Sequence, residues 1–120
     1  MEIEFENVTL VSSNVNAKKK VINDLSVLIR KNQITGIIGP SGSGKTVFLE
    51  LINALVFPTK GQIKVGNTII GKGKKIENLE KFRKNIGLIY QNPEMQFFNS
   101  TVRKEIEFAL VNFNFMVSEK

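Results

Sequence analysis

The N-terminal part of the chain shows a two-residue period of apolar and polar side chains. Ile3 to Leu10 alternate in this way, with a slip of phase between Phe5 and Val8. Such alternation is typical of a half-buried strand, so we expect one over these residues. A polar loop is expected from Ser12 to Lys20. A second strand is predicted where alternation resumes, at Leu25, Val27 and Ile29.

A change from strand-like to helix-like spacing follows. The segment 33–38 is short and nearly all of its residues are apolar, which favours a buried parallel strand. From Lys45 the apolar residues fall on one face of a helix, which Pro58 ends and Gly61 follows. The residues of this face are Phe48, Leu49, Leu51, Ile52 and Leu55. The pattern therefore predicts a strand, a loop and a helix in succession.

The remainder of the chain is predicted to add four elements. In chain order they are a strand or hairpin over Ile63–Ile70 that turns around Gly66-Asn67, a helical turn or two over Leu79–Lys84, an apolar strand over Ile86–Tyr90, and a helix from Val102 to about Val111. Thr101 suits the N-cap of that last helix, and Glu105 lies near its positive end. Strands and helices thus mix, as in an α/β protein.

Composition limits the class of protein. A chain of 120 residues holds one domain at most, and 42% hydrophobic with 23% charged residues is typical of a soluble globular protein. No apolar run approaches the roughly 18 residues of a membrane-spanning helix. The N-terminus is acidic and alternating, so no cleavable secretion signal is expected. The absence of cysteine excludes disulfides and thiolate metal sites.

The net charge of +6 comes mostly from lysine. Part of it is clustered in Lys18-Lys19-Lys20 and in Lys72, Lys74 and Lys75. Such clusters suit an anionic partner, whether a nucleotide, a lipid surface or a nucleic acid. Charge runs are, however, usually solvated loops, and this is the interpretation that the sequence favours for both clusters.

One motif carries chemistry. The segment Gly39-Pro40-Ser41-Gly42-Ser43-Gly44-Lys45-Thr46 fits G-x-x-x-x-G-K-[ST] at every fixed position, and it lies between the predicted strand and helix. Loop amides and the helix N-terminus then converge on an anion, and glycines let the backbone approach it. Lys45 would reach the β- and γ-phosphates of a nucleoside triphosphate, and the Thr46 hydroxyl would coordinate Mg²⁺. The motif alone does not distinguish kinases, GTPases, motors and other P-loop classes.

Other residues narrow the class. They are Leu51-Ile52-Asn53-Ala54-Leu55, Pro58-Thr59-Lys60-Gly61, the stretch from Ile89 to Phe98 (IYQNPEMQFF), and Thr101-Val102. Together with the P-loop they resemble the ATPase subunits of ABC transporters, most closely those of energy-coupling factor (ECF) transporters. The resemblance implies an α/β fold: a P-loop NTPase (RecA-like) core with an antiparallel β subdomain, truncated before the Walker B strand. Residues 1–120 would be the N-terminal part of a single ATP-binding domain, whose helical subdomain begins near residue 101.

The resemblance also implies a set of site residues. ATP would be held by Gly39, Pro40, Ser41, Gly42, Ser43, Gly44, Lys45, Thr46 and Val47. Gln91 matches the Q-loop glutamine of the family, which reaches Mg²⁺ and the attacking water. Lys45 and Gln91 would be the catalytic residues, and Thr46 and Gln91 the metal ligands. The exposed Met95 to Phe98 would receive a helix of the membrane subunit; alternatively, Phe97 and Phe98 fill the core beneath the loop.

The function implied by the resemblance is that of an ATP-binding, energy-coupling subunit of a transporter that takes up vitamins or transition-metal ions. ATP would close a dimer with a second ATPase domain, identical or similar, and the motion would pass to a transmembrane subunit. The subunit would be cytoplasmic and peripheral on the inner face of the membrane. Alternatives are a P-loop module acting on nucleic acid and a non-catalytic fragment. No nucleic-acid partner is expected, because basic and aromatic residues are not interleaved.

Three departures from the family pattern bear on activity. Val47 stands where a second hydroxyl usually helps to hold the α-phosphate, and Ser12 where an aromatic residue usually stacks on adenine. We therefore expect weaker and less base-selective ATP binding. The chain also has no LSGGQ-like signature, no apolar strand ending in Asp-Glu and no histidine, and neither Glu94 nor Glu105 follows a buried strand. We expect a fragment of a protein about twice as long that does not hydrolyse ATP by itself.

Overall fold

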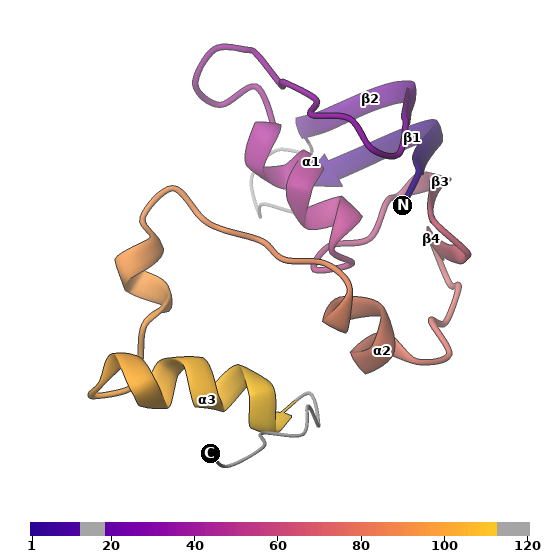
Figure 1. Cartoon of the computed structure of the whole chain (residues 1–120). Helices are drawn as coiled ribbons and strands as arrows, with labels where there is room; N and C mark the ends of the chain where they lie inside the picture. Colours follow the sequence, from indigo (N-terminus) through magenta and orange to yellow (C-terminus); the bar gives the residue numbers. More distant parts are fainter. Residues whose placement is uncertain (13–18, 113–120) are drawn as a thin grey trace. The chain divides into compact units, whose positions relative to one another are not determined.

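The computed structural model describes residues 1–12 and 19–112 and divides into two compact units, Met1–Leu79 and Glu80–Lys120. The first unit contains an antiparallel sheet and one helix, and the second is built of short helical segments (Figure 1). In the described part of the chain, no helix is both long and apolar enough to cross a membrane.

Four antiparallel strands form the sheet of the first unit, in the order β2-β1-β3-β4. Their bounds are β1 Ile3–Ser12, β2 Lys19–Ile29, β3 Lys60–Val65 and β4 Thr68–Gly71. Three of the four strand regions predicted in this unit are confirmed, including the hairpin at Gly66-Asn67. The predicted loop is shorter than expected, because β1 continues to Ser12 and β2 already begins at Lys19. The rest of that loop lies outside the described residues.

The slip of phase in β1 is a β-bulge. Phe5 pairs with Val27, and the next registered pair is Val8 with Leu25. Asn7 lies between them with a positive φ of 48°, in the left-handed region that Asn tolerates better than most residues. The extra residue turns both Phe5 and Val8 toward the interior, where they are 1% and 0% exposed.

Helix α1, Lys45–Ile52, supplies the second layer of the core. The ring of its Phe48 stacks on Phe5 of β1, with centroids 4.5 Å apart and planes 8° from parallel. The largest fully buried side chains of this unit are Phe5, Leu51, Ile63, Ile70, Val8, Val65 and Pro58. The sheet face that pairs Phe5 with Ile63 and Ile63 with Ile70 therefore anchors the helix that follows the P-loop.

Two predicted strands are not formed. Residues 33–38 adopt no strand, and Ile34 and Ile38 are fully exposed; residues 86–90 are likewise irregular, with Ile89 79% exposed. A parallel strand requires neighbours that pair with its N–H and C=O groups on both sides. Among the described residues, the only sheet is the antiparallel one, and neither segment joins it. Both segments are apolar, but the prediction that each forms a strand of a sheet is wrong for this chain.

The helical predictions are confirmed in position, but α1 ends at Ile52, before the predicted Leu55 and Pro58. Helix α2 spans Leu79–Lys84, where one or two turns are expected, and the second unit continues with the 3₁₀ turn η1, Pro93–Gln96, and helix α3, Val102–Asn112. The Thr101 hydroxyl accepts a hydrogen bond from the Lys104 amide at 3.3 Å, so Thr101 is the N-cap of α3.

Candidate phosphate-binding site

The P-loop leads directly into α1, as its motif requires. Gly44 is the residue before the helix, and its φ of 94° is one that residues with a Cβ rarely adopt. A Cβ at Gly44 would lie 3.1 Å from the carbonyl oxygen of Val21 in β2. Glycine is therefore needed here both for the backbone conformation and for the close approach of the loop to the sheet.

The Lys45 side chain folds back over its own loop. Its Nζ donates hydrogen bonds to the carbonyl oxygens of Gly39 at 2.7 Å and Pro40 at 2.8 Å. The Ser43 amide donates to the same Pro40 oxygen at 3.2 Å, which closes the turn. Lys45 is the first residue of α1, and no side chain caps this positive end of the helix. This is an arrangement that attracts a multiply charged anion.

A cavity of about 600 Å³ opens beside the loop. Five P-loop residues line it: Gly39, Pro40, Ser43, Gly44 and Lys45. Ser41, Gly42, Thr46 and Val47 are not among its lining residues; Thr46 is exposed and Val47 half-buried on α1. The structure thus brings together the two ends of the motif and leaves its predicted metal ligand facing solvent.

Two residues of the cavity wall escaped the sequence analysis. Val21 and Asn23 of β2 line it, together with apolar residues of the same strand. The alternation of β2 indicated a strand, but nothing local in the sequence places this strand against Gly44. Ser12 stands where the family usually has an aromatic residue that stacks on adenine. It is the last residue of β1 and pairs with Lys19, which lies two residues before Val21 in β2.

Gln91 lies in the second unit, directly after residues 86–90, and its side chain is exposed. Its shared contact with a metal ion at Thr46 stays a prediction, because the two residues belong to different units. Within the described ranges, no group of three or more acidic, His or Cys side chains could hold a metal ion without help from a ligand.

The second unit presents an apolar patch, which we define as Met95, Phe97 and Phe98. They are 81%, 65% and 65% exposed, so the alternative that Phe97 and Phe98 fill a core is wrong for this chain. Phe98 meets Phe108 of α3 edge to face, with centroids 4.6 Å apart. A hollow of about 310 Å³ lies beside the apolar patch. Its lining includes Phe97, Val102 and Ile106.

Glu105 of α3 holds the backbone next to this patch. One of its carboxylate oxygens accepts hydrogen bonds from the Asn99 amide and the Asn99 side chain, both at 2.9 Å, and from the Phe98 amide at 3.3 Å. The Asn99 backbone and side-chain donors hold the pKa of Glu105 below its ordinary value. Glu105 is therefore a structural residue of this turn.

Comparison with known proteins agrees with this geometry. The sequence profile of the ABC transporter family matches residues 22–119. The chain is 42% identical over 96 residues to the energy-coupling factor transporter ATP-binding protein EcfA2 of Bacillus subtilis, covering 80% of this chain and 35% of the relative. It is 40% identical to the corresponding EcfA3 protein of Oenococcus oeni, covering 100% of this chain and 41% of the relative. The chain therefore spans less than half the length of these relatives.

Solved structures show the same fold. The ABC transporter cassette MJ0796, in its dimeric structure, superposes with a TM-score of 0.79 at 25% identity, over 98% of this chain and 50% of that one. The protein cbiO1 of Clostridium perfringens superposes with a TM-score of 0.73 at 24% identity, over 92% of this chain and 42% of that one. With the family profile covering most of the sequence and the P-loop in place before α1, this chain belongs to the ABC transporter family.

Proposed function

We propose that the protein is the ATP-binding, energy-coupling subunit of an ECF-type membrane transporter, and that ATP hydrolysis drives transport in the full-length protein. The observation that supports this most is that Lys45, whose ammonium lies over the P-loop, begins the uncapped N-terminus of α1 beside an open cavity. Both groups favour a polyphosphate. The ECF identity rests on similarity to relatives of that name.

Nucleotide binding requires Lys45 to exchange its present partners. The carbonyl oxygens of Gly39 and Pro40 satisfy the ammonium in this structure. Phosphate oxygens are stronger acceptors, because they are charged. The β- and γ-phosphates of ATP would therefore draw the ammonium toward them, while Gly42 and Gly44 keep the loop amides accessible.

Mg²⁺ fits this loop through one hydroxyl. Thr46 begins α1 beside Lys45, and its exposed side chain is free to turn toward bound phosphates. Mg²⁺ is commonly coordinated by one or two protein oxygens together with phosphate oxygens and water, so one hydroxyl of this loop is enough protein ligand for an ion that the phosphates also hold. The ion would neutralise phosphate charge. The Gln91 amide would be the second protein ligand and would orient the attacking water.

The partners follow from the apolar patch and from the relatives. A helix of a transmembrane subunit would pack on Met95, Phe97 and Phe98, because exposed Met and Phe side chains suit a helix-in-groove contact. A second ATPase domain would complete the ATP site, as the dimeric cassette MJ0796 suggests. The protein cbiO1 is part of the transporter complex cbiONQ.

The subunit would then lie on the cytoplasmic face of the membrane. Residues 1–120 would form the N-terminal part of one ATP-binding domain, and the helical subdomain of that domain would begin near residue 101.

A calorimetric titration of the chain with MgATP tests the proposal. We expect binding that Lys45→Met weakens about 10- to 100-fold, since a hydrogen-bonded charge contributes about 1.5–3 kcal/mol. Lys31→Met, which removes one lysine in the turn after β2, is the matched control and should bind as the unchanged chain does. GTP should bind almost as well as ATP, because Ser12 offers no aromatic surface for the base. A folded chain that binds neither ATP, GTP nor pyrophosphate would refute the proposal.

A further inference from the structure

The topology of the sheet gathers lysines from distant parts of the sequence at one of its ends. Ser12 of β1 pairs with Lys19 and Val11 with Lys20, while Thr9 of the same strand pairs with Lys60 at the start of β3. Strand β4 ends there too, because its last residue, Gly71, pairs with Gln62. The lysines of this basic end are Lys19, Lys20, Lys60, Lys72 and Lys74.

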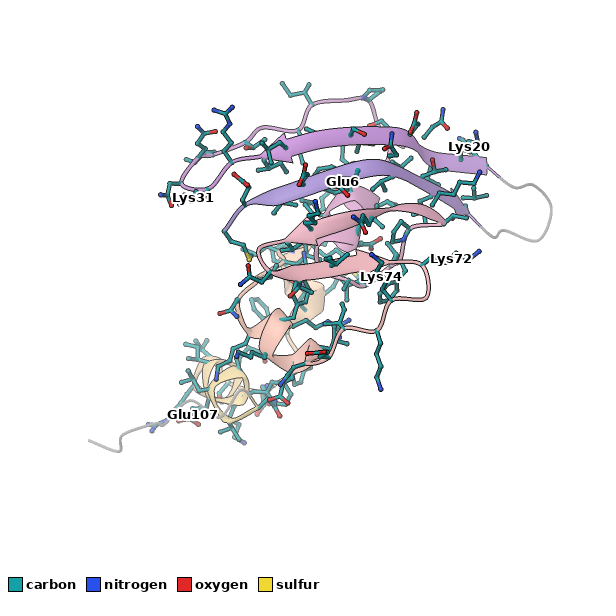
Figure 2. The ribbon with its side chains drawn as sticks, turned by 90° about the vertical axis from the view of Figure 1, so that its right-hand side faces the viewer. Glu6, Lys20, Lys31, Lys72, Lys74 and Glu107 are labelled. Atoms are coloured by element: carbon teal, nitrogen blue, oxygen red, sulfur yellow. The ribbon has the colours of Figure 1, made fainter. Side chains whose placement is uncertain are left out.

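The lysines of the basic end carry their charge at the surface. All five lysines are exposed, and none of them is in an ion pair within the part of the chain that the structure describes. Lys74 donates to the neutral amide of Gln62 at 2.6 Å. Figure 2 shows Lys20, Lys72 and Lys74 at one end of the sheet and Lys31 at the other. The lysines of the basic end therefore lie away from Arg30 and Lys31, the exposed positive residues after β2 (Figure 2).

The basic end adjoins the P-loop through β2. Lys20 precedes Val21, whose carbonyl oxygen lies 3.1 Å from where a Cβ at Gly44 would be. The Lys20 ammonium donates to the Asn23 side-chain oxygen at 3.1 Å, and Asn23 lines the same cavity as Gly44 and Lys45. Lys20 does not line the cavity itself, but this hydrogen bond holds its ammonium against a residue that does, and Lys19 precedes it in β2.

We propose that Lys19 and Lys20, backed by the other lysines of the basic end, steer the polyphosphate of the incoming nucleotide onto the P-loop. The inference rests on the proposed function and adds a kinetic role for residues outside the motif. Charges of one sign beside a binding cavity raise the association rate of an oppositely charged ligand, and salt screens the effect over about 10 Å at 0.1 M. Lysines that act at a distance change the association rate and leave the dissociation rate nearly unaltered.

Stopped-flow binding of a fluorescent ATP analogue to the full 120-residue chain tests this. At about 20 mM salt, Lys19→Gln with Lys20→Gln should lower the association rate constant about 5- to 20-fold without changing the dissociation rate constant. The difference should vanish at about 500 mM salt. The matched control is Arg30→Gln with Lys31→Gln, which removes two exposed positive charges at the other end of β2 and should lower the rate less than half as much on a logarithmic scale.

Several outcomes overturn the inference while leaving the proposed function intact. Equal loss of rate in both double variants would show that net charge alone matters. A change confined to the dissociation rate would show a direct contact instead of steering. Binding of duplex DNA more tightly than ATP, lost in the Lys19/Lys20 variant, would identify nucleic acid as the partner. Failure of the unchanged chain to bind the analogue at all would instead refute the proposed function. Circular dichroism of each variant confirms that it is folded.

Discussion

At the scale of single residues, the structure shows how few side chains hold each functional turn. The P-loop is closed by Lys45 and the Pro40 carbonyl, and the turn beside the apolar patch is closed by Glu105. Both contacts place a charged group against backbone polar groups, where its hydrogen bonds are stronger than those of a neutral side chain. Each turn therefore depends on the identity of one charged residue.

For Glu105 this dependence predicts a pH effect. Its pKa lies below the ordinary 4.5, so its stabilisation of the turn is fully present above that value and is lost as pH falls through the lowered folded-state pKa. The Asn99 amide proton, followed by NMR, should titrate with a midpoint below 4.5. Glu105→Gln should abolish this titration, and Glu107→Gln, two positions along α3, should preserve it. A midpoint at or above 4.5 would contradict the assignment.

At the scale of elements, the bulge in β1 and the start of β3 depend on each other. Gly61 of β3 lies opposite the bulge with a φ of 76°, and a Cβ there would come within 2.4 Å of the carbonyl oxygens of both Glu6 and Asn7. The bulge that turns Phe5 and Val8 inward thus requires a glycine on the neighbouring strand. This relation between β1 and β3 is invisible in the alternation pattern of either strand alone.

Gly61→Ala and Gly73→Ala distinguish the cost of a left-handed backbone conformation from the cost of a steric clash between the new Cβ and neighbouring backbone. Gly73 has nearly the same φ, 72°, but nothing lies within 4 Å of its Cβ position. Gly73→Ala should lower the free energy of unfolding by about 1–2 kcal/mol, the cost of a left-handed residue with a Cβ. Gly61→Ala should cost about 1–3 kcal/mol more, because backbone must move. Urea unfolding measures both, and equal losses would show that the bulge yields without cost.

At the scale of the whole molecule, binding and turnover are expected to separate. The chain carries the P-loop but spans 41% of the length of the Oenococcus oeni relative, and its sequence has no signature, Walker B carboxylate or histidine. We expect the 120 residues to bind MgATP without releasing phosphate above the rate of Lys45→Met. A version extended to the length of the relatives should turn ATP over. Phosphate release by the unchanged 120-residue chain, lost in Lys45→Met, would contradict this.

The sequence pattern predicted many elements of this molecule, because the signals for those elements lie within short stretches of sequence. The P-loop, helix α1, the N-cap Thr101 and the hairpin at Gly66-Asn67 depend on residues within a few positions of each other, so a short stretch of sequence specifies them. The slip of phase after Phe5 lies where the structure has the bulge. Residues 33–38 and 86–90 were mispredicted, because apolar composition states a preference for burial and a strand forms only when a partner supplies its hydrogen bonds.

By itself, the sequence determined that a P-loop motif is followed by a helix and that strands form before and after it. Tertiary structure alone decided that Val21 touches Gly44, that five distant lysines share one end of the sheet, and that Met95, Phe97 and Phe98 face solvent. The physical reason is that helical spacing and turn chemistry act over a few residues. Strand register, burial and the field of many charges depend on which distant segments pair.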